Sequence, residues 1–410
     1  MTNHNAISLR MGSAHNERDQ ELSLPSGWTA TLYPPRETPA LTDTDIRDAF
    51  AQPVGIEPIS RAARGAKQAV VLVDDFRRPT PAETLCTVII DELNAAGLTA
   101  EQISIVLANG AHRPMTKRET RARLGGVMSR VGAVVSHDAF SGDATFKGIT
   151  SSSTPVLVNA AAARADFSVA ISTVYPHGLT AWAGGAKMVL PGISHVSTIH
   201  CHHSRLKGGT WGGNPSACPA RRDIEEAGRL FGLDVAVCSV LNQRRELCGI
   251  GMGEPTKAHR RAVAAARRAY ATEINGAAAD LVICNAYPFD ADPTQLSKAY
   301  APAKPFGAPV LVVADFADPS PYHGLYDGPL APYRRRPPVE PPKHTDELLN
   351  KATVFMYCPQ YGKGYVPTQR GWYCDGDWGR LMAAMARRFP KASVAVLPAA
   401  PLQILKPAGP

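Results

Sequence analysis

The chain has 410 residues, of which 44% are hydrophobic and 20% are charged, and this length favours two domains of a globular protein. No apolar run approaches the roughly 18 residues that cross a bilayer, and the polar segment 1–21 lacks the core of a signal peptide. The net charge of +8 is spread along the chain without a zinc-finger or RNA-binding motif, which argues against nucleic acid and suits small anionic substrates. We therefore expect a cytoplasmic protein with no membrane partner, whose eight cysteines are reduced thiols.

Short β-branched apolar runs alternate with helical stretches. Runs that are apolar on both faces are typical of buried parallel strands covered by helices. The predicted strands are 69–73, 103–107, 131–135, 167–172, 234–241, 281–284, 309–313, 353–357 and 393–397. Helices are predicted over 81–96, 116–124 and 257–274. The alternation predicts an α/β fold with two Rossmann-like domains and an active site in the cleft between them.

A domain boundary is predicted where the long helix 257–274 meets Asn275 and Gly276. Residues 1–274 would form a cofactor-binding catalytic domain, and residues 275–410 a C-terminal α/β domain that completes the substrate site. The proline-rich segment 333–343 is predicted to be a loop, because proline is excluded from helix interiors and central strands.

Polar clusters follow four of the predicted strands, at the ends where ligands gather in such folds. They occupy residues 74–81, 108–114, 174–177 and 285–290. One such cluster would mean little, since strand ends often carry turn residues. Four clusters in equivalent positions favour a shared site.

The segment with the most candidate functional residues begins at His177 and contains Gly184, Gly185 and Lys187. Paired glycines allow backbone N–H groups to approach a ligand closely. Lys187 is a candidate for phosphate binding or covalent attachment, or it is a solvated lysine beside a turn. Further along, the segment 200–203 holds three histidines, of which we expect one to bind Zn, Ni, Cu or Fe.

These motifs resemble the nickel-dependent lactate racemase family, over roughly residues 65 to 330. The first element is Asp75-Phe76-Arg77-Arg78-Pro79, which fits the family's D-x-x-R-P pattern. The second is Gly110-Ala111-His112-Arg113-Pro114, which fits a G-x-H-R-P pattern. Both follow predicted strands, as in the family.

The most specific likeness lies between His177 and His203. The family's histidine and lysine are ten residues apart, as His177 and Lys187 are, and its nickel-binding histidine follows sixteen residues later, at His203. This spacing selects His203 over His200 and His202. A later D-x-x-x-x-Q-x-x-K pattern is matched by Asp290, Gln295 and Lys298.

The resemblance implies a nickel pincer nucleotide, pyridinium-3-thioamide-5-thiocarboxylic acid mononucleotide, as cofactor. Lys187 would hold it through a thioamide bond, with Asp75, Gly184 and Gly185 also in the cofactor site, and His203 would be a nickel ligand. The cofactor-synthesis enzymes would be partners of the chain.

The resemblance also implies a racemase or epimerase acting on a small anionic 2-hydroxy acid. His112 and His177 would stand on opposite sides of the α-carbon as bases, while hydride passes reversibly to the cofactor through a 2-keto acid. Arg78, Gln295 and Lys298 would bind the substrate, two of them by charge. Two open alternatives are a family relative that only binds nucleotide or metal, and a zinc hydrolase.

The chain departs from the family pattern at two places, the substrate pocket and the cofactor loop. Thr294 stands where lactate racemases have tyrosine, and neither Trp372 nor Trp378 matches the tryptophan that closes the lactate pocket. We therefore expect a pocket larger than lactate needs. Ala181 replaces a family glycine, and the bulky Trp182 follows it.

Three further histidines are assigned no part in the chemistry. His137 is interpreted as a turn residue and His195 as the cap of a helix that starts near residue 194. His323 falls in the predicted C-terminal domain, from which it could reach the cleft, and it has no assigned role.

Overall fold

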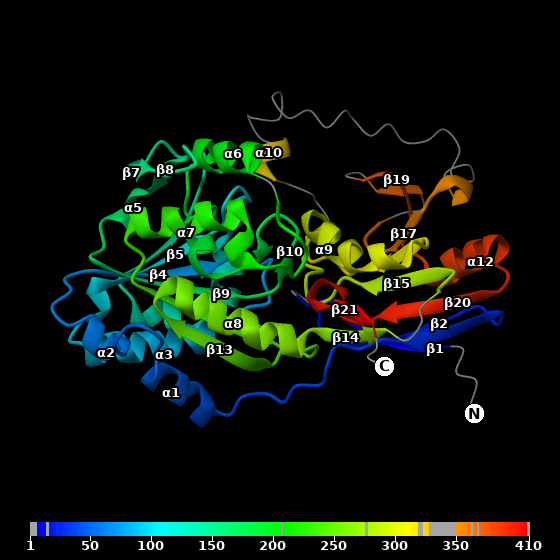
Figure 1. Cartoon of the computed structure of the whole chain (residues 1–410), viewed down its shortest axis with the longest axis horizontal. Coiled ribbons are helices and arrows are strands. Elements are labelled where there is room, and N and C mark those ends of the chain that lie inside the picture. Colours follow the sequence, from blue (N-terminus) through cyan, green and yellow to red (C-terminus); the bar gives the residue numbers. More distant parts are fainter. Residues whose placement is uncertain are drawn as a thin grey trace. The chain divides into compact units, whose positions relative to one another are not determined.

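The structure is a computed structural model that describes residues 6–13, 16–206, 208–274, 278–318, 323–327, 349–361, 364–366 and 369–407. Its contacts divide the chain into two compact units. Unit 1 comprises Met1–Glu37, Tyr270–Pro321 and Arg335–Pro410, and unit 2 comprises Thr38–Ala269 and Tyr322–Arg334. Both units are α/β, as predicted, with the elements labelled in Figure 1.

Unit 2 is built on a six-stranded sheet with the order β13-β12-β9-β4-β5-β6. Its parallel strands are β4 (Ala69–Asp74), β5 (Ile103–Ala108), β6 (Ala133–Ser136), β9 (Phe167–Thr173) and β12 (Val235–Leu241). The edge strand β13 (Leu247–Gly253) runs antiparallel to β12. Every residue of β4, β9 and β12 is buried, which explains why their sequences are apolar without alternation.

Helices cover both faces of this sheet (Figure 1). The helices of unit 2 are α1 (Asp43–Ala51), α2 (Ile59–Ala62), α3 (Ala82–Ala95), α4 (Lys117–Leu124), α5 (Ala160–Ala163), α6 (Val196–Arg205), α7 (Pro219–Phe231), α8 (Pro255–Ala269) and α10 (Gly324–Asp327). Val71 of β4 packs in a core with α1, α2 and α3, whereas the neighbouring Leu72 packs in a second core with α6 and α7. Successive strand side chains therefore supply two separate cores.

Two small antiparallel ribbons complete the described part of unit 2. β7 (Ala144–Ile149) pairs with β8 (Pro155–Asn159). β10 (Pro176–His177) pairs with β11 (Ala181–Trp182), so His177 lies opposite Ala181.

Unit 1 is built on a seven-stranded sheet with the order β18-β19-β17-β16-β15-β20-β3. The strands are β3 (Trp28–Leu32), β15 (Leu281–Asn285), β16 (Val310–Val313), β17 (Val354–Tyr357), β18 (Gly364–Val366), β19 (Gln369–Asp375) and β20 (Ala392–Leu397). All pairings are parallel except that of β18 with β19. Helices α9 (Leu296–Tyr300) and α12 (Trp378–Arg388) pack in this unit, beside the pairs β1 (Ala6–Met11) with β2 (Arg18–Ser23) and β14 (Ala271–Ile274) with β21 (Ile404–Pro407).

The nine predicted strands are confirmed with end shifts of one or two residues. The predicted helix 257–274 was wrong at its end, because α8 stops at Ala269 and residues 271–274 form β14. Pairing with β21 satisfies the backbone hydrogen-bonding groups of this segment. The contact-based division also differs from a boundary at 274, since β3 pairs with β20 and so belongs to unit 1. The predicted loop 333–343 lies outside the described residues.

Candidate functional site

Three of the four polar clusters leave the same edge of the sheet in unit 2. β9, β4 and β5 are neighbours in the sheet and run parallel. Their following loops, 75–80, 109–114 and 174–177, therefore start side by side, as predicted. The fourth cluster, 285–290, follows β15 in the sheet of unit 1.

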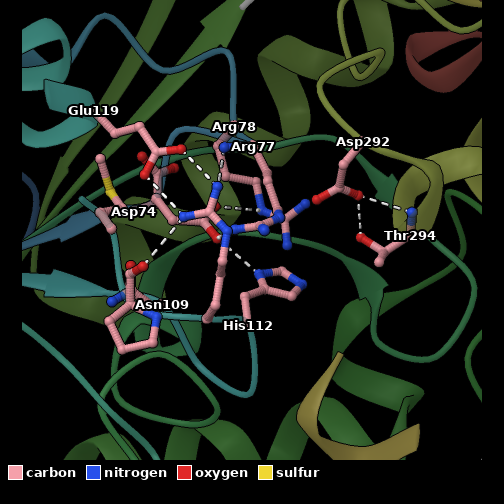
Figure 2. Close-up of polar contacts among 12 residues, drawn as sticks. Asp74, Arg77, Arg78, Asn109, His112, Glu119, Asp292 and Thr294 are labelled. Atoms are coloured by element: carbon pink, nitrogen blue, oxygen red, sulfur yellow. Dashed lines mark hydrogen bonds and ion pairs between the residues drawn. The ribbon is translucent and has the colours of Figure 1, made fainter. Parts of the chain in front are cut away.

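Asp75 and His112 form a hydrogen-bonded pair between the first two loops. Oδ2 of Asp75 lies 2.7 Å from Nδ1 of His112, and both side chains are largely buried. Arg77 Nη1 lies 3.3 Å from Oδ2 of the same carboxylate and Arg78 Nε 4.0 Å from Oδ1. Figure 2 shows Arg77 and Arg78 beside His112. Because an ionised carboxylate only accepts, Nδ1 of His112 carries the proton and Nε2 is the basic nitrogen.

The protonation of this pair follows from its surroundings. Burial alone would raise the pKa of Asp75, but His112, Arg77 and Arg78 outweigh it and hold that pKa well below its usual range. Burial is the largest influence on His112 and lowers its pKa, against the opposing effect of Asp75. At pH 7 His112 is therefore mainly neutral and able to accept a proton.

Arg123 of α4 holds the loop after β4 in place. Its guanidinium donates to the carbonyls of Arg78 at 3.0 Å and Thr80 at 2.9 Å, and it forms an ion pair with buried Asp74. The sequence showed only a basic residue in the last turn of a predicted helix. Nothing in that pattern indicated that it folds back on the loop that carries Asp75.

Hydrogen bonds and an ion pair hold the loop after β5, residues 109–114, in place. Asn109 Nδ2 donates to the carbonyl of His137 at 2.6 Å, and the N–H of Gly110 donates to the carbonyl of Gly192 at 2.8 Å. Arg113 makes a two-point ion pair with Glu119, at 2.9 and 2.7 Å. The arginine of the His-Arg-Pro element thus joins this loop to α4.

His137 lies behind this loop as a buried structural residue. Its Nε2 is 3.0 Å from the carbonyl of Ser194. Burial lowers the pKa of His137 to about 4, so the ring is neutral at pH 7. His137 was predicted to be a turn residue without a part in the chemistry, and the structure places it instead as a buried residue that joins two loops.

His177 is held differently from His112. The N–H of Leu179 donates to His177 Nδ1 at 3.2 Å, so the proton of the neutral ring is on Nε2. Opposite it, Ala181 has a φ of 60°, in the left-handed region that glycine adopts more easily. Trp182 is fully buried and donates from Nε1 to the carbonyl of Gly213 at 2.9 Å, so its bulk lies in the protein core.

The turn before Lys187 depends on its two glycines. Gly184 and Gly185 have φ values of 89° and 63°, and a Cβ on Gly184 would lie 2.8 Å from Cγ2 of Val174. Arg221 Nη1 donates to the carbonyl of Gly184 at 2.8 Å. Lys187 is partly exposed in the short helical turn Gly185–Met188 that follows.

The histidine cluster falls on α6, where each histidine has a different environment. His203 is partly exposed, and its Nδ1 lies 3.0 Å from the carbonyl of Ile199, so Nδ1–H donates and Nε2 is the nitrogen with the lone pair. His202 is fully buried, with Nδ1 2.8 Å from Oδ2 of Asp223. His195 caps α6 by accepting from the N–H of Ser197, which confirms the predicted cap. Among the described residues, no group of three or more His, Cys, Asp or Glu has metal-binding geometry.

The remaining predicted residues form a chain of contacts in unit 1. Lys298 Nζ donates to Gln295 Oε1 at 2.5 Å, and Gln295 Nε2 donates to Thr294 Oγ1 at 2.7 Å. Thr294 in turn donates to Asp292, a contact also drawn in Figure 2. Asp290 of the same motif accepts from the backbone N–H groups of residues 12 and 13, at 2.7 and 3.2 Å, and so has a structural role.

Comparison with known proteins shows a similarity to one family. Residues 15–210 match the model of the lactate racemase N-terminal domain. The lactate racemase of Thermoanaerobacterium thermosaccharolyticum is 26% identical over 293 residues, which are 68% of this chain and 67% of that protein. The chain is similar to the lactate racemase family in sequence and in fold. The lactate racemase of Lactiplantibacillus plantarum is also 26% identical, over 52% of this chain and 51% of that protein.

Solved structures share the fold of this chain. The lactate racemase apoprotein from T. thermosaccharolyticum has a TM-score of 0.73 at 20% identity, covering 98% of this chain and all of that one (100%). A Thermotoga maritima protein has a TM-score of 0.67 at 16% identity, covering 90% of this chain and 100% of that one. The family resemblance found in the motifs is thereby confirmed. In the part of the chain that the structure describes, no helix has the length and apolarity to span a membrane.

Proposed function

We propose that this protein is an isomerase, a racemase or epimerase of small 2-hydroxy acids that uses His112 and His177. The curated relatives named above are lactate racemases. The observation that carries the proposal is the contrasting hydrogen bonding of the two histidines. The Nδ1–H of His112 donates a hydrogen bond to Asp75, whereas Nδ1 of His177 accepts one from a backbone N–H.

This contrast suits the inversion of a carbon that bears a hydroxyl group. The basic Nε2 of His112 can take the hydroxyl proton of one enantiomer and become an imidazolium, while the imidazolium form of His177 can return a proton to the keto oxygen and become neutral, which forms the other enantiomer. Each histidine exchanges its role when the reaction runs in reverse. Asp75 orients His112 and stabilises its protonated form, and its contacts favour this role over the predicted part in cofactor binding.

The residues of unit 2 fit the cofactor that the resemblance implies. When bound, the nickel pincer nucleotide would supply the acceptor for the hydride of the α-carbon, with a 2-keto acid as intermediate. Lys187 would hold it through a thioamide bond, beside the close backbone approach that Gly184 and Gly185 allow. His203 would bind nickel through Nε2, because its Nδ1–H is directed at the carbonyl of Ile199.

We further propose that Arg78, Gln295 and Lys298 bind the substrate. Arg78 is partly exposed and its charge suits a carboxylate. Lys298 and Gln295 are already hydrogen-bonded to each other, which fixes their head groups. Thr294 beside them is smaller than the tyrosine of lactate racemases, so we expect an acid larger than lactate.

The test is purification from cells that carry the cofactor-synthesis enzymes, followed by intact mass, nickel content and absorbance. Lys187→Ala and His203→Ala should lose cofactor or nickel. His112→Ala and His177→Ala should keep both and lose turnover on a panel of single-enantiomer 2-hydroxy acids analysed by chiral chromatography. A purified protein with an unmodified Lys187 and no bound nickel would overturn the cofactor proposal. Loss of the cofactor in the His112 or His177 variants would contradict the roles of these two histidines.

A further inference from the structure

A third imidazole lies against the candidate base His112. The ring centroids of His323 and His112 are 5.2 Å apart, with an angle of 84° between the ring planes. This is the edge-to-face arrangement that aromatic rings prefer. His323 immediately precedes α10 and belongs by its contacts to unit 2, although the sequence places it among residues of the other unit.

The backbone anchors His323 beside the loop that carries His112. The N–H of Gly324 donates to the carbonyl of Ala111 at 2.6 Å. A Cβ on Gly324 would lie 2.4 Å from Phe140 and 2.9 Å from that carbonyl oxygen, so glycine permits this close approach. Leu325 is fully buried in the core that includes α6 residues. These contacts do not involve the ring of His323, which itself accepts a hydrogen bond from the N–H of Leu325 through Nδ1 at 3.4 Å.

We propose that His323 is a positioning residue that holds the ring of His112, an inference that rests on the proposed function of His112 as a base. The hydrogen bond to Asp75 fixes one edge of the His112 ring at Nδ1. A single hydrogen bond leaves the ring free to tilt about that contact. The nearly perpendicular ring of His323 limits the tilt and keeps Nε2 in one direction. Base catalysis depends on this direction, because proton transfer requires hydrogen-bond geometry.

The first test uses the protein without cofactor. His112 is modified with diethylpyrocarbonate across a pH range, and its rate is followed by peptide mass spectrometry in wild type, His323→Ala and His323→Phe. We expect His323→Ala to raise the rate constant for His112 about 3- to 10-fold, as loss of an aromatic pair would. His323→Phe keeps the ring contact and should stay near the wild-type rate.

His195→Asn is the matched control, because asparagine can keep the helix cap that His195 provides and this residue has no assigned part in the reaction. Thermal unfolding of each variant separates positioning from a general loss of stability. Unchanged reactivity of His112 in folded His323→Ala would overturn the proposal.

The second test uses the enzyme loaded with cofactor and a racemised acid. His323→Ala should lower kcat about 3- to 10-fold with little change in KM, and His323→Phe should restore most of it. A change in KM alone would overturn the positioning role and indicate substrate binding. Absence of racemisation in wild type, with His112 reactivity changed as expected, would reject the proposed function and leave the positioning inference standing.

Discussion

Oδ2 of Asp75 accepts a hydrogen bond from Nδ1 of His112 at 2.7 Å, although the two residues lie in different loops. The pairing arises because β4 and β5 are adjacent and parallel, so that the loops after them begin at one edge. It directs the basic Nε2 of His112 away from the carboxylate. The remaining charges around Asp75 belong to Arg77 and Arg78, which keep the carboxylate ionised.

Asp75→Asn should weaken catalysis without unfolding the protein. The carboxylate raises the pKa of His112 against the larger opposing effect of burial, so its removal should lower that pKa further. We expect kcat/KM to fall about 10- to 100-fold and the acid limb of its pH profile to move to lower pH. Asp138→Asn, at an exposed turn, is the control. An unchanged profile would show that Asp75 does not act through His112.

Gly184→Ala should destabilise the turn that carries Lys187. The new Cβ would meet Val174 at 2.8 Å, and the φ of 89° is unfavourable for alanine. We expect the free energy of unfolding to fall by about 1–3 kcal/mol in urea titrations. Gly178→Ala is the matched control in the same segment, since its Cβ would meet no atom within 4 Å. Equal effects of the two substitutions would argue against strain at Gly184.

The stability of the protein should fall with acidity partly through His137. Its folded-state pKa of about 4 lies below the unfolded value near 6.5, so the unfolded state binds a proton first as the pH drops. The contribution of neutral His137 to the free energy of unfolding is complete above about pH 6.5. It is lost progressively towards pH 4, by about 3 kcal/mol in total. His137→Asn should flatten this dependence relative to wild type when unfolding is measured at pH 7.5 and pH 5. A constant difference between the two proteins at both pH values would contradict this account.

Asp223→Ala should loosen α6, which carries His203. Asp223 is buried on α7 and accepts from His202 at 2.8 Å and from Thr154 at 2.9 Å. Removing the carboxylate leaves these buried donors without their acceptor, at a cost of about 3 kcal/mol in unfolding free energy. Nickel retention by the loaded protein should also decrease.

Glu226→Ala is the control for this substitution. Glu226 lies on the same helix, and its bonds to Ser151 are exposed. We expect a change below about 1 kcal/mol there. Similar losses in both variants would mean that burial of Asp223 is not decisive.

Much of the fold was predictable because buried parallel strands have a distinctive composition. The apolar runs that became β4, β5 and β9 identified the central strands, and the polar residues after them identified the loops of the candidate site. The end of α8 was not predictable in this way. Residues 271–274 continue a helix-compatible pattern, and only pairing with the distant β21 makes them a strand.

The family motifs were identifiable without a structure, because the spacing of His177, Lys187 and His203 is a local property of the chain. The side chains that restrain these residues became known only from the packing of strands and helices. Asp75 meets His112 through adjacent strands, and Asp223 meets His202 across two helices. His323, far along the chain, reaches His112 through the anchoring of α10. Such contacts join residues that are far apart in the sequence. They depend on how helices and strands pack in space, and no local sequence pattern specifies this packing.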